Sequence, residues 1–275
     1  MSCTAPLLRG LTALALLALS TVALSDITTA LEDAATSTQR SEANRARNVY
    51  RHPVETLTFF GLKPDMTVLE IHPGNLWYTE VLGPVLKADG QLIVAGYDSA
   101  LPGQPAYTYK LQEAMEQRLA DDTALFGDVS VVKLSPPDSI ALGEPGSVDM
   151  VLTFRSLHGW TQAGVTDQIL RAFFTVLKPG GTLGVVQHRT VPEAIADPAA
   201  FTGYLTEQQV VDAATAAGFV LEAKSEINAN PRDIRQHPAG VWTLPPTLRL
   251  GEVDRDKYLA IGESDRMTLR FRKPE

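Results

Sequence analysis

Residues 67–80 read Thr67-Val68-Leu69-Glu70-Ile71-His72-Pro73-Gly74-Asn75-Leu76-Trp77-Tyr78-Thr79-Glu80. The stretch opens as a short apolar run closed by a carboxylate, which predicts a buried strand whose last side chain reaches a ligand. It then turns at Pro73-Gly74 and continues with apolar residues at 78, 81, 82, 85 and 86, the spacing of an amphipathic helix. A strand, a tight turn and a helix form the opening unit of a nucleotide-type α/β fold, where the turn lets the backbone approach a ligand near a helix N-terminus.

Strands and helices alternate on either side of this unit. Further strands are predicted over 91–98, 129–134, 148–154, 182–187, 219–227 and 267–271, and helices over 53–60, 106–120, 169–177 and 206–217. This alternation predicts one domain built on a largely parallel sheet with helices on both faces. The proline-rich segment Asn228–Ser264 has no sustained periodicity, so we expect a long insertion that serves as a lid or binding loop, or as decoration.

Composition limits the possible partners. The 275 residues are 44% apolar and 20% charged, which is enough for one large α/β domain. The formal net charge of -8 argues against a general electrostatic attraction to nucleic acid. After residue 25, no apolar stretch approaches the roughly 20 residues that a membrane span needs.

The first 25 residues resemble a secretory leader in their pattern. Arg9 precedes the apolar run Leu11–Leu19, and Ala23-Leu24-Ser25 places small residues around a plausible cleavage site. We therefore predict a signal peptide over 1–25 and a periplasmic or secreted protein; the alternative is an uncleaved anchor. The single cysteine, Cys3, lies in this leader, so the mature chain would have neither disulfides nor cysteine-bound metals.

The mature chain divides into two predicted parts. The polar, alanine-rich residues 26–47 are expected to form a mobile N-terminal arm, helical in places near Glu42–Val49. Residues 48–275 are expected to form the α/β domain, with 228–264 as its insertion.

Several motifs match a known superfamily. They are Val68-Leu69-Glu70-Ile71 before Gly74, Asp98 after the next strand, and Leu177-Lys178-Pro179-Gly180-Gly181 before the strand at 182. With them, residues 48–275 resemble the class I S-adenosylmethionine-dependent methyltransferases. Two further motifs resemble those of a narrower group, the exported, predicted methyltransferases of Gram-negative bacteria. They are Phe154-Arg155 with His158 and Trp160, and Ser264-Asp265-Arg266-Met267-Thr268-Leu269.

The resemblance implies a Rossmann-like seven-stranded sheet, mostly parallel, with helices on both faces and the last strand antiparallel. It also implies S-adenosylmethionine as the cofactor, lying across the carboxyl ends of the first strands. Gly74 would then pass close to the methionine part of the cofactor, Asp98 would accept hydrogen bonds from the ribose hydroxyls, and Glu70 would meet the ammonium group. Carboxyl ends of strands at a topological switch point are where open α/β sheets bind ligands.

The chain departs from the superfamily in the turn. Of three glycines usual there, only the middle one is present, as Gly74, while His72, Asn75 and Leu76 occupy positions that are commonly small. Leu76 is the side chain that would fill the cofactor space if it pointed toward Gly74.

Other candidate residues have two interpretations each. Tyr78 is a candidate for cofactor contact, and the alternative is packing on the helix face; for Glu70 the alternative is a helix-capping carboxylate. Arg155 and His158 follow the strand where this fold usually holds the acceptor, and a histidine is a natural general base near neutral pH. His188 is a weaker candidate, and together with His158 it would supply only half of a metal site, so no metal is predicted. No Gly-x-Ser-x-Gly elbow of a serine hydrolase is present.

Two functions remain open from the sequence. The first is S-adenosylmethionine-dependent methyl transfer to an unknown small acceptor. The second is a non-catalytic exported binding protein that retains the fold, which the changed turn and the supply of a cytoplasmic cofactor outside the inner membrane both favour. The two differ in whether an open space lies beside Gly74 or is closed by Leu76 and Trp77.

Overall fold

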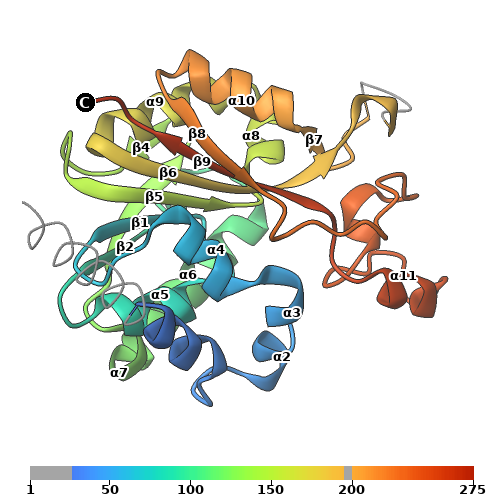
Figure 1. Ribbon diagram of the computed structural model, residues 1–275, viewed down its shortest axis with the longest axis horizontal. Coiled ribbons are helices and arrows are strands. Elements are labelled where there is room, and N and C mark those ends of the chain that lie inside the picture. Colours follow the sequence, from blue (N-terminus) through green and yellow to red (C-terminus); the bar gives the residue numbers. More distant parts are fainter. Residues whose placement is uncertain (1–26, 195–199) are drawn as a thin grey trace, which may run out of the picture.

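The computed structural model describes residues 27–194 and 200–275, so the predicted signal peptide lies outside the described residues. Within them, a nine-stranded sheet has the order β4-β3-β2-β1-β5-β6-β9-β8, with β7 paired to β6 beside this path (Figure 1). The strands are β1 (Thr67–Ile71), β2 (Gln91–Gly96), β3 (Ser130–Ser135), β4 (Ser139–Ala141), β5 (Val148–Phe154), β6 (Leu177–Thr190), β7 (Leu205–Thr206), β8 (Val220–Ser225) and β9 (Arg266–Arg272).

The predicted architecture is confirmed. Strands β3, β2, β1, β5 and β6 pair in parallel, and β9 pairs antiparallel with both β6 and β8, so the last strand of the chain lies inside the sheet. The short strands β4 and β7 were not predicted; β4 forms an antiparallel edge on β3. Both have too few residues to show a pattern of their own in the sequence.

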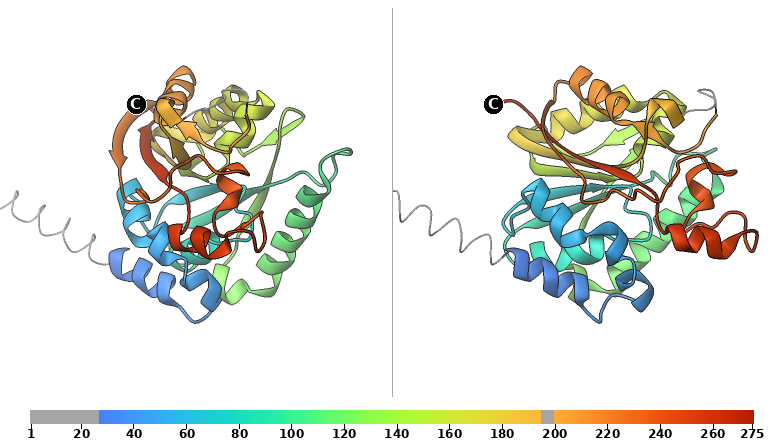
Figure 2. Two further views of the ribbon diagram at one scale, coloured as in Figure 1. Left: turned by 90° about the vertical axis from the view of Figure 1, so that its right-hand side faces the viewer. Right: turned by 45° about the vertical axis from the view of Figure 1, so that its right-hand side comes forward.

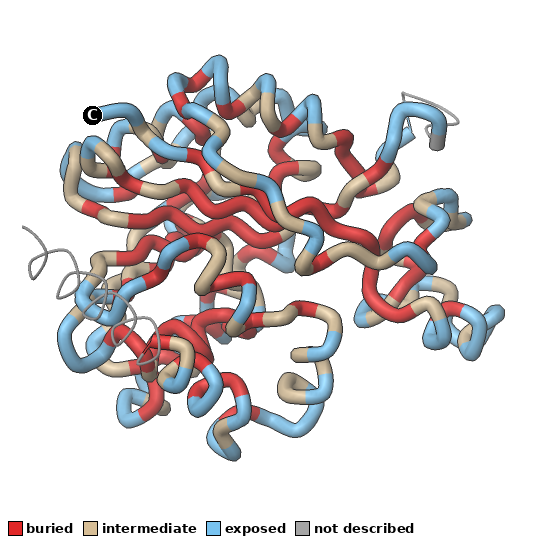
Figure 3. The backbone as a smooth tube through the Cα atoms, in the orientation of Figure 1, coloured by how far each residue is buried: buried red, intermediate tan, exposed pale blue. Residues whose placement is uncertain are grey.

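Helices cover both faces of the sheet. They are α2 (Glu42–Arg45), α3 (Asn48–Arg51), α4 (Pro53–Phe60), α5 (Thr79–Leu86), α6 (Ala106–Asp121), α7 (Thr123–Phe126), α8 (Leu157–Ala163), α9 (Thr166–Val176), α10 (Glu207–Ala216) and α11 (Arg255–Ile261), with the 3-10 turns η1 (Pro192–Ala194) and η2 (Gly240–Thr243). Apolar side chains of α4, α5, α6 and α7 form one core with the sheet, and those of α8, α9 and α10 form another on the opposite face. The strands between these layers are the most continuously buried part of the backbone (Figure 3).

Alternation along β1 decides where its side chains point. Val68 belongs to the core under α5, while Leu69 and Ile71 belong to the core under α9. Because successive strand residues face opposite sides, Glu70 lies on the α5 side, at the end of the strand.

Helix ends follow the expected local signals. Pro53 begins α4, and Gly61 ends it in a left-handed conformation with φ 81°. Thr206 and Gln209 form the predicted capping box of α10. The helix α9 ends at Val176, and β6 starts at once with Leu177, five residues earlier than predicted, because the Lys178–Gly181 stretch bulges within the pairing with β5.

The segment expected to be a mobile arm instead packs against the domain. Residues 27–36 are helical, and Ile27, Leu31 and Ala34 are buried in the core under α5. The arm then places the fully buried Arg40 against Glu80, with Nε donating to Oε2 at 3.3 Å. Figure 2 shows this N-terminal part on the side of the sheet opposite α10. Few but well-spaced apolar residues therefore suffice to pack this N-terminal arm against the domain.

The insertion between β8 and β9 lies beyond the carboxyl ends of β5 and β6, where α11 is seen at the right of Figure 1. It includes η2 and α11 and is anchored by buried polar residues, among them Asp233, which accepts from the backbone N–H of Asp265 at 2.8 Å. Among the helices that the structure describes, none combines the length and the apolar character that crossing a bilayer requires.

Candidate functional site

The turn after β1 has an unusual backbone. His72, Gly74 and Leu76 all have positive φ, at 45°, 58° and 61°. Gly74 is the middle glycine of the turn that the superfamily resemblance implies, and His72 and Leu76 occupy positions that are commonly small or glycine there. A left-handed residue with a side chain costs about 1–2 kcal/mol relative to the right-handed form. The chain therefore keeps the glycine-turn conformation at two positions where its own side chains oppose it, and such strain is typical of functional sites.

Open space lies beside this turn. A Cβ atom added to Gly74 would meet no heavy atom within 4 Å. Leu76 is 3% exposed and belongs to the same core cluster as Trp77 and Tyr78. Leu76 is thus accounted for by core packing under α5.

His72 is fixed above the end of β2. Its Nε2 lies 2.8 Å from the carbonyl oxygen of Leu134, and its ring stacks on Tyr97 with centroids 4.3 Å apart. Burial lowers the pKa of His72 to about 4, so the ring is neutral at pH 7. These contacts fix the orientation of the His72 side chain, which stands where the superfamily usually has the first glycine.

Glu70 lies at the base of the turn. Its Oε2 accepts a hydrogen bond from Thr79 Oγ1 at 2.7 Å, and the residue is 1% exposed. Burial raises the pKa of Glu70 to about 7, although the bond from Thr79 opposes this shift. Glu70 contacts a side chain of α5, and no side chain caps the N-terminus of that helix. The helix-capping alternative is therefore not what the structure shows.

Asp98 follows β2 and is held by its neighbours. Oδ1 accepts from Lys133 Nζ at 2.9 Å and from the Ala100 backbone at 3.2 Å, and Oδ2 accepts from Ser139 Oγ at 2.9 Å. The bonds from Lys133 and Ser139 lower the pKa of Asp98, so it is ionised at neutral pH. A carboxylate offers about four acceptor positions, so these three bonds leave little capacity unless the half-exposed Lys133 moves.

Tyr78 lies in the core. Its ring stacks on Phe154 with centroids 3.7 Å apart, and its hydroxyl donates to the carbonyl oxygen of Arg51 at 2.9 Å. These contacts explain Tyr78 as a packing residue, which was the alternative to cofactor contact.

Arg155 and His158 lie together past the end of β5. Arg155 has φ 64°, and its backbone N–H donates to the Val186 carbonyl of β6 at 2.7 Å. Burial lowers the pKa of Arg155 to about 10, so it remains charged at neutral pH. Within residues 27–194 and 200–275, its guanidinium has no hydrogen bond or ion pair. The residue is only partly buried, and the Glu263 carboxylate is near enough to oppose the fall in its pKa.

The two histidines named from the sequence meet. The rings of His158 and His188 have centroids 5.5 Å apart. His158 Nδ1 lies 3.2 Å from Gln187 Nε2, and His188 Nδ1 lies 2.6 Å from Ser264 Oγ. Burial lowers the pKa of His158 to about 4 and that of His188 well below its usual value, so both are neutral at pH 7. Among the described residues no group of three or more potential metal ligands is present.

Aromatic residues that the sequence did not single out surround His158. Phe201 and Trp242 each lie with ring centroids 5.8 Å from that of His158, and Tyr204 lies 6.1 Å from His188. Trp242 comes from the insertion, which places part of this segment at the site. Nothing in the local sequence pairs Trp242 with His158, because the contact spans more than 80 residues.

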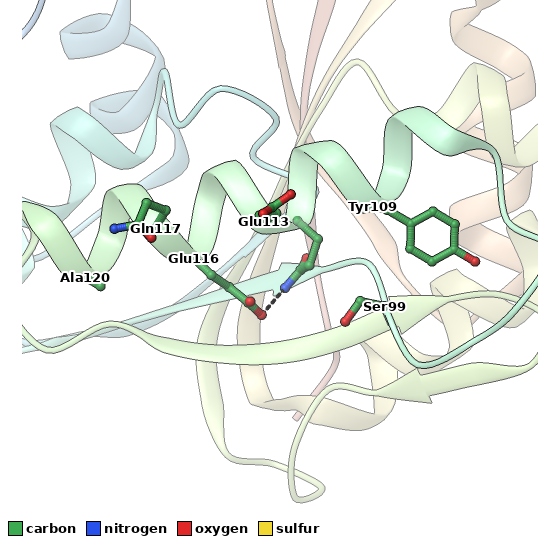
Figure 4. A pocket seen from close by; sticks show the side chains of 7 residues that line it. Ser99, Tyr109, Glu113, Glu116, Gln117 and Ala120 are labelled. Carbon is green, nitrogen blue, oxygen red and sulfur yellow. Dashed lines mark hydrogen bonds between the residues drawn. The ribbon is translucent and has the colours of Figure 1, made fainter.

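A separate pocket of about 320 Å³ opens beside Ser99 and α6 (Figure 4). Its walls carry Glu113 and Glu116, and the Gln112 amide donates to Glu116 at 2.7 Å. The pocket is acidic and lies just past Asp98 in the chain.

Comparison with known proteins finds no matching family model and no matching curated protein. Solved structures do match. An S-adenosylmethionine-dependent methyltransferase from Aquifex aeolicus has a TM-score of 0.55 at 16% identity, over 83% of this chain and 93% of that one. Geranyl diphosphate methyltransferase, solved with S-adenosylmethionine, has a TM-score of 0.53 at 12% identity, over 88% and 94%.

The chain has the methyltransferase fold. The [4+2]-cyclase SpnF matches as well, with a TM-score of 0.54 at 18% identity, over 82% of this chain and 81% of that one. The fold therefore hosts more than one chemistry, and the function has to be argued from the site.

Proposed function

We propose that this protein binds S-adenosylmethionine at the carboxyl ends of β1 and β2 and transfers its methyl group to a small acceptor beside His158. The observation that carries the proposal is the turn after β1, whose left-handed residues keep the glycine-turn shape and leave open space beside Gly74. The fold of the solved structures described above supports it.

The residues fit the cofactor in chemistry. Glu70 would meet the ammonium group, and a nearby cation would lower its raised pKa and favour the ionised form. Asp98 would accept a hydrogen bond from a ribose hydroxyl, either beside the hydrogen bond from Lys133 or in place of it. When bound, S-adenosylmethionine supplies an electrophilic methyl group.

The residues on the acceptor side have separate roles. Neutral His158 accepts a hydrogen bond or a proton from the acceptor, but a pKa of about 4 makes it a weak base. Its main contribution would be orientation, because methyl transfer depends chiefly on alignment of the reacting atoms. Phe201 and Trp242 would exclude water from the reacting atoms.

The second function is the binding protein that retains the fold. The observation in its favour is that the Asp98 carboxylate already accepts from Lys133, Ser139 and Ala100. For either function, we propose export to the periplasm or beyond, on the strength of the leader pattern in residues 1–25.

Calorimetric titration of S-adenosylmethionine and S-adenosylhomocysteine into the purified protein tests the proposal. We expect micromolar binding, weakened at least tenfold in Asp98→Ala, because the variant loses the carboxylate proposed to hold the ribose. Asp128→Ala, at an exposed position, is the matched control and should bind like the wild type. Circular dichroism establishes that each variant is folded.

One result would count against the enzyme, and another against the role of Asp98. If a folded wild-type sample gives no heat with either ligand at high protein concentration, the non-catalytic binding protein becomes the better-supported function. Equal affinity in wild type and Asp98→Ala would remove Asp98 from the cofactor site.

A further inference from the structure

Three arginines contact a single carboxylate, and a fourth, Arg155, lies near enough to interact with it electrostatically. They form what we call the arginine cluster: Arg47, Arg51, Arg155 and Arg266. Glu263 accepts from Arg47 Nε at 2.6 Å, from Arg51 Nε at 3.1 Å and from Arg266 Nη2. The members come from the N-terminal segment, the end of β5 and the start of β9, so only the folded chain brings them together.

The charge of this cluster is not balanced by the protein. Four guanidinium groups against one carboxylate leave three positive charges in excess. Arg51 and Arg266 are each 2% exposed, so water screens them poorly. Arg155 and Arg266 lie close enough to Arg51 that, with burial, they hold its pKa well below the usual value. A charge excess of this kind in a buried place is costly unless a partner supplies the opposite sign.

Several N–H groups of the cluster also lack acceptors. Arg47 Nη2, Arg51 Nη1 and Arg266 Nε are buried without a hydrogen-bond partner among the described residues. The Arg155 guanidinium makes no hydrogen bond there either, but the residue is only partly buried and its nitrogens are not among these buried atoms. Buried polar groups are nearly always paired, so unpaired donors on several guanidinium groups at one place point to an acceptor from outside the chain.

The cluster adjoins the acceptor side of the proposed site. Arg155 lies three residues before His158, and Arg266 pairs in register with His188 across β6 and β9. A pocket of about 300 Å³ is lined by Glu263 and Ser264, although by none of the four arginines, and the Ser264 hydroxyl contacts His188. This volume suits a small molecule. The pocket beside α6, in contrast, carries carboxylates and would repel an anion.

We propose that the arginine cluster binds an oxyanion, a phosphate or carboxylate group, of the molecule that accepts the methyl group. The assignment to the acceptor rests on the proposed function; the anion site itself does not. Guanidinium groups suit this role because their planar N–H donors match the oxygens of phosphate and carboxylate.

The same chemistry has a second source, the carboxylate of the cofactor's methionine part. The positions favour the acceptor. Gly74, Glu70 and Asp98 belong to the ends of β1 and β2, whereas the cluster comes from the end of β5, the start of β9 and the N-terminal segment, where Arg51 also lies over the Trp77 ring.

Calorimetric titration of the purified protein with inorganic phosphate and with succinate tests the site. We expect binding of at least one of these probes, weakened at least tenfold by Arg155→Gln and partly retained by Arg155→Lys. Arg155 is the variant of choice because its side chain has no partner in the described chain to lose, so the unfolding midpoint should not fall. Arg171→Gln removes an exposed arginine of α9, on the other face of the sheet, and should bind as the wild type does.

A repeat of the phosphate titration in the presence of saturating S-adenosylmethionine separates the sources. Unchanged phosphate affinity supports an acceptor site. Competition between the two assigns the cluster to the cofactor and overturns the proposal.

Failure of each idea can be recognised. Binding of phosphate by a protein that does not bind S-adenosylmethionine keeps the anion site and overturns its link to methyl transfer. Absence of heat with both anions, or equal heat in Arg155→Gln, overturns the anion site while cofactor binding remains a separate result.

Discussion

Glu70 is a carboxylic acid placed where water does not reach it. Burial raises its pKa from 4.5 to about 7, so the folded protein holds a proton there that the unfolded chain releases earlier. Below pH 4.5 the carboxyl group of Glu70 is protonated in both the folded and the unfolded state, so it does not lower the stability of the folded state. As the pH rises from 4.5 to 7, the unfolded state gains stability by ionising first, so the folded state becomes less stable; above 7 the cost is constant.

A Glu70→Gln variant should remove this pH dependence. We expect its free energy of unfolding, relative to the wild type, to rise by about 3 kcal/mol between pH 4 and pH 8, since each pKa unit is worth about 1.4 kcal/mol. Urea unfolding at pH 4, 6 and 8 measures it. Glu55→Gln, at an exposed position of α4, is the control and should follow the wild type at each pH. Parallel curves for Glu70→Gln and wild type would contradict an elevated pKa.

Some residue roles were readable from the sequence and others were not. Glu70, Gly74 and Asp98 were placed at the ends of adjacent strands because the apolar runs that precede them mark those strands. The stacking of Tyr78 on Phe154 was not readable, since it depends on how α5 packs against β5. The arginine cluster could not be predicted from the sequence because its contacts are long-range: Arg47 and Glu263 are 216 residues apart.

At the scale of elements, the capping box at the start of α10 makes a measurable contribution to the free energy of unfolding. Thr206 Oγ1 accepts from the Gln209 backbone at 3.2 Å, while Gln209 Oε1 accepts from the Thr206 backbone at 2.8 Å. Thr206→Ala should reduce the free energy of unfolding by about 1 kcal/mol, the usual cost of losing an N-cap.

Denaturant unfolding at equilibrium measures this loss. Thr175→Ala is the matched control, because the Thr175 hydroxyl bonds a carbonyl of its own helix on an exposed face and caps nothing. A Thr206→Ala loss no greater than that of Thr175→Ala would show that the cap contributes nothing.

The elements that sequence analysis predicted are those with a clear period. Strands β1, β2, β5 and β9 and helices α4, α9 and α10 have apolar positions that repeat at the proper spacing. Helix α8 was missed because Gly159 interrupts a seven-residue segment with only two buried apolar side chains. Helix α11 was missed because Tyr258 is its single buried residue, so its surroundings rather than its own pattern decide its conformation.

At the scale of the molecule, the N-terminal segment is tied to the domain by a buried ion pair. Arg40 donates to Glu80, to the Ala35 carbonyl and to Asn48, and its guanidinium lies 4.7 Å from the Trp77 ring centroid. Arg40→Met should destabilise the protein by about 3–5 kcal/mol, because it leaves Glu80 with less compensation in a buried place.

A double variant identifies the cause of that loss. If the uncompensated carboxylate is responsible, Glu80→Gln in the Arg40→Met background should recover part of the stability, measured by urea unfolding. Strictly additive losses in the two single variants and the double variant would mean that the pair is not coupled.

The position of β9 has a consequence for how the chain acquires its structure during synthesis. Strands β6 and β8 each pair with β9, which follows both of them in the chain. Until β9 has emerged from the ribosome, β6 and β8 each have an edge without a partner, and the N-terminal segment has no Arg266 to meet. The sheet therefore cannot be completed before β9 is made, and a chain that stops before residue 266 would lose the pairing that joins β8 to the rest of the sheet.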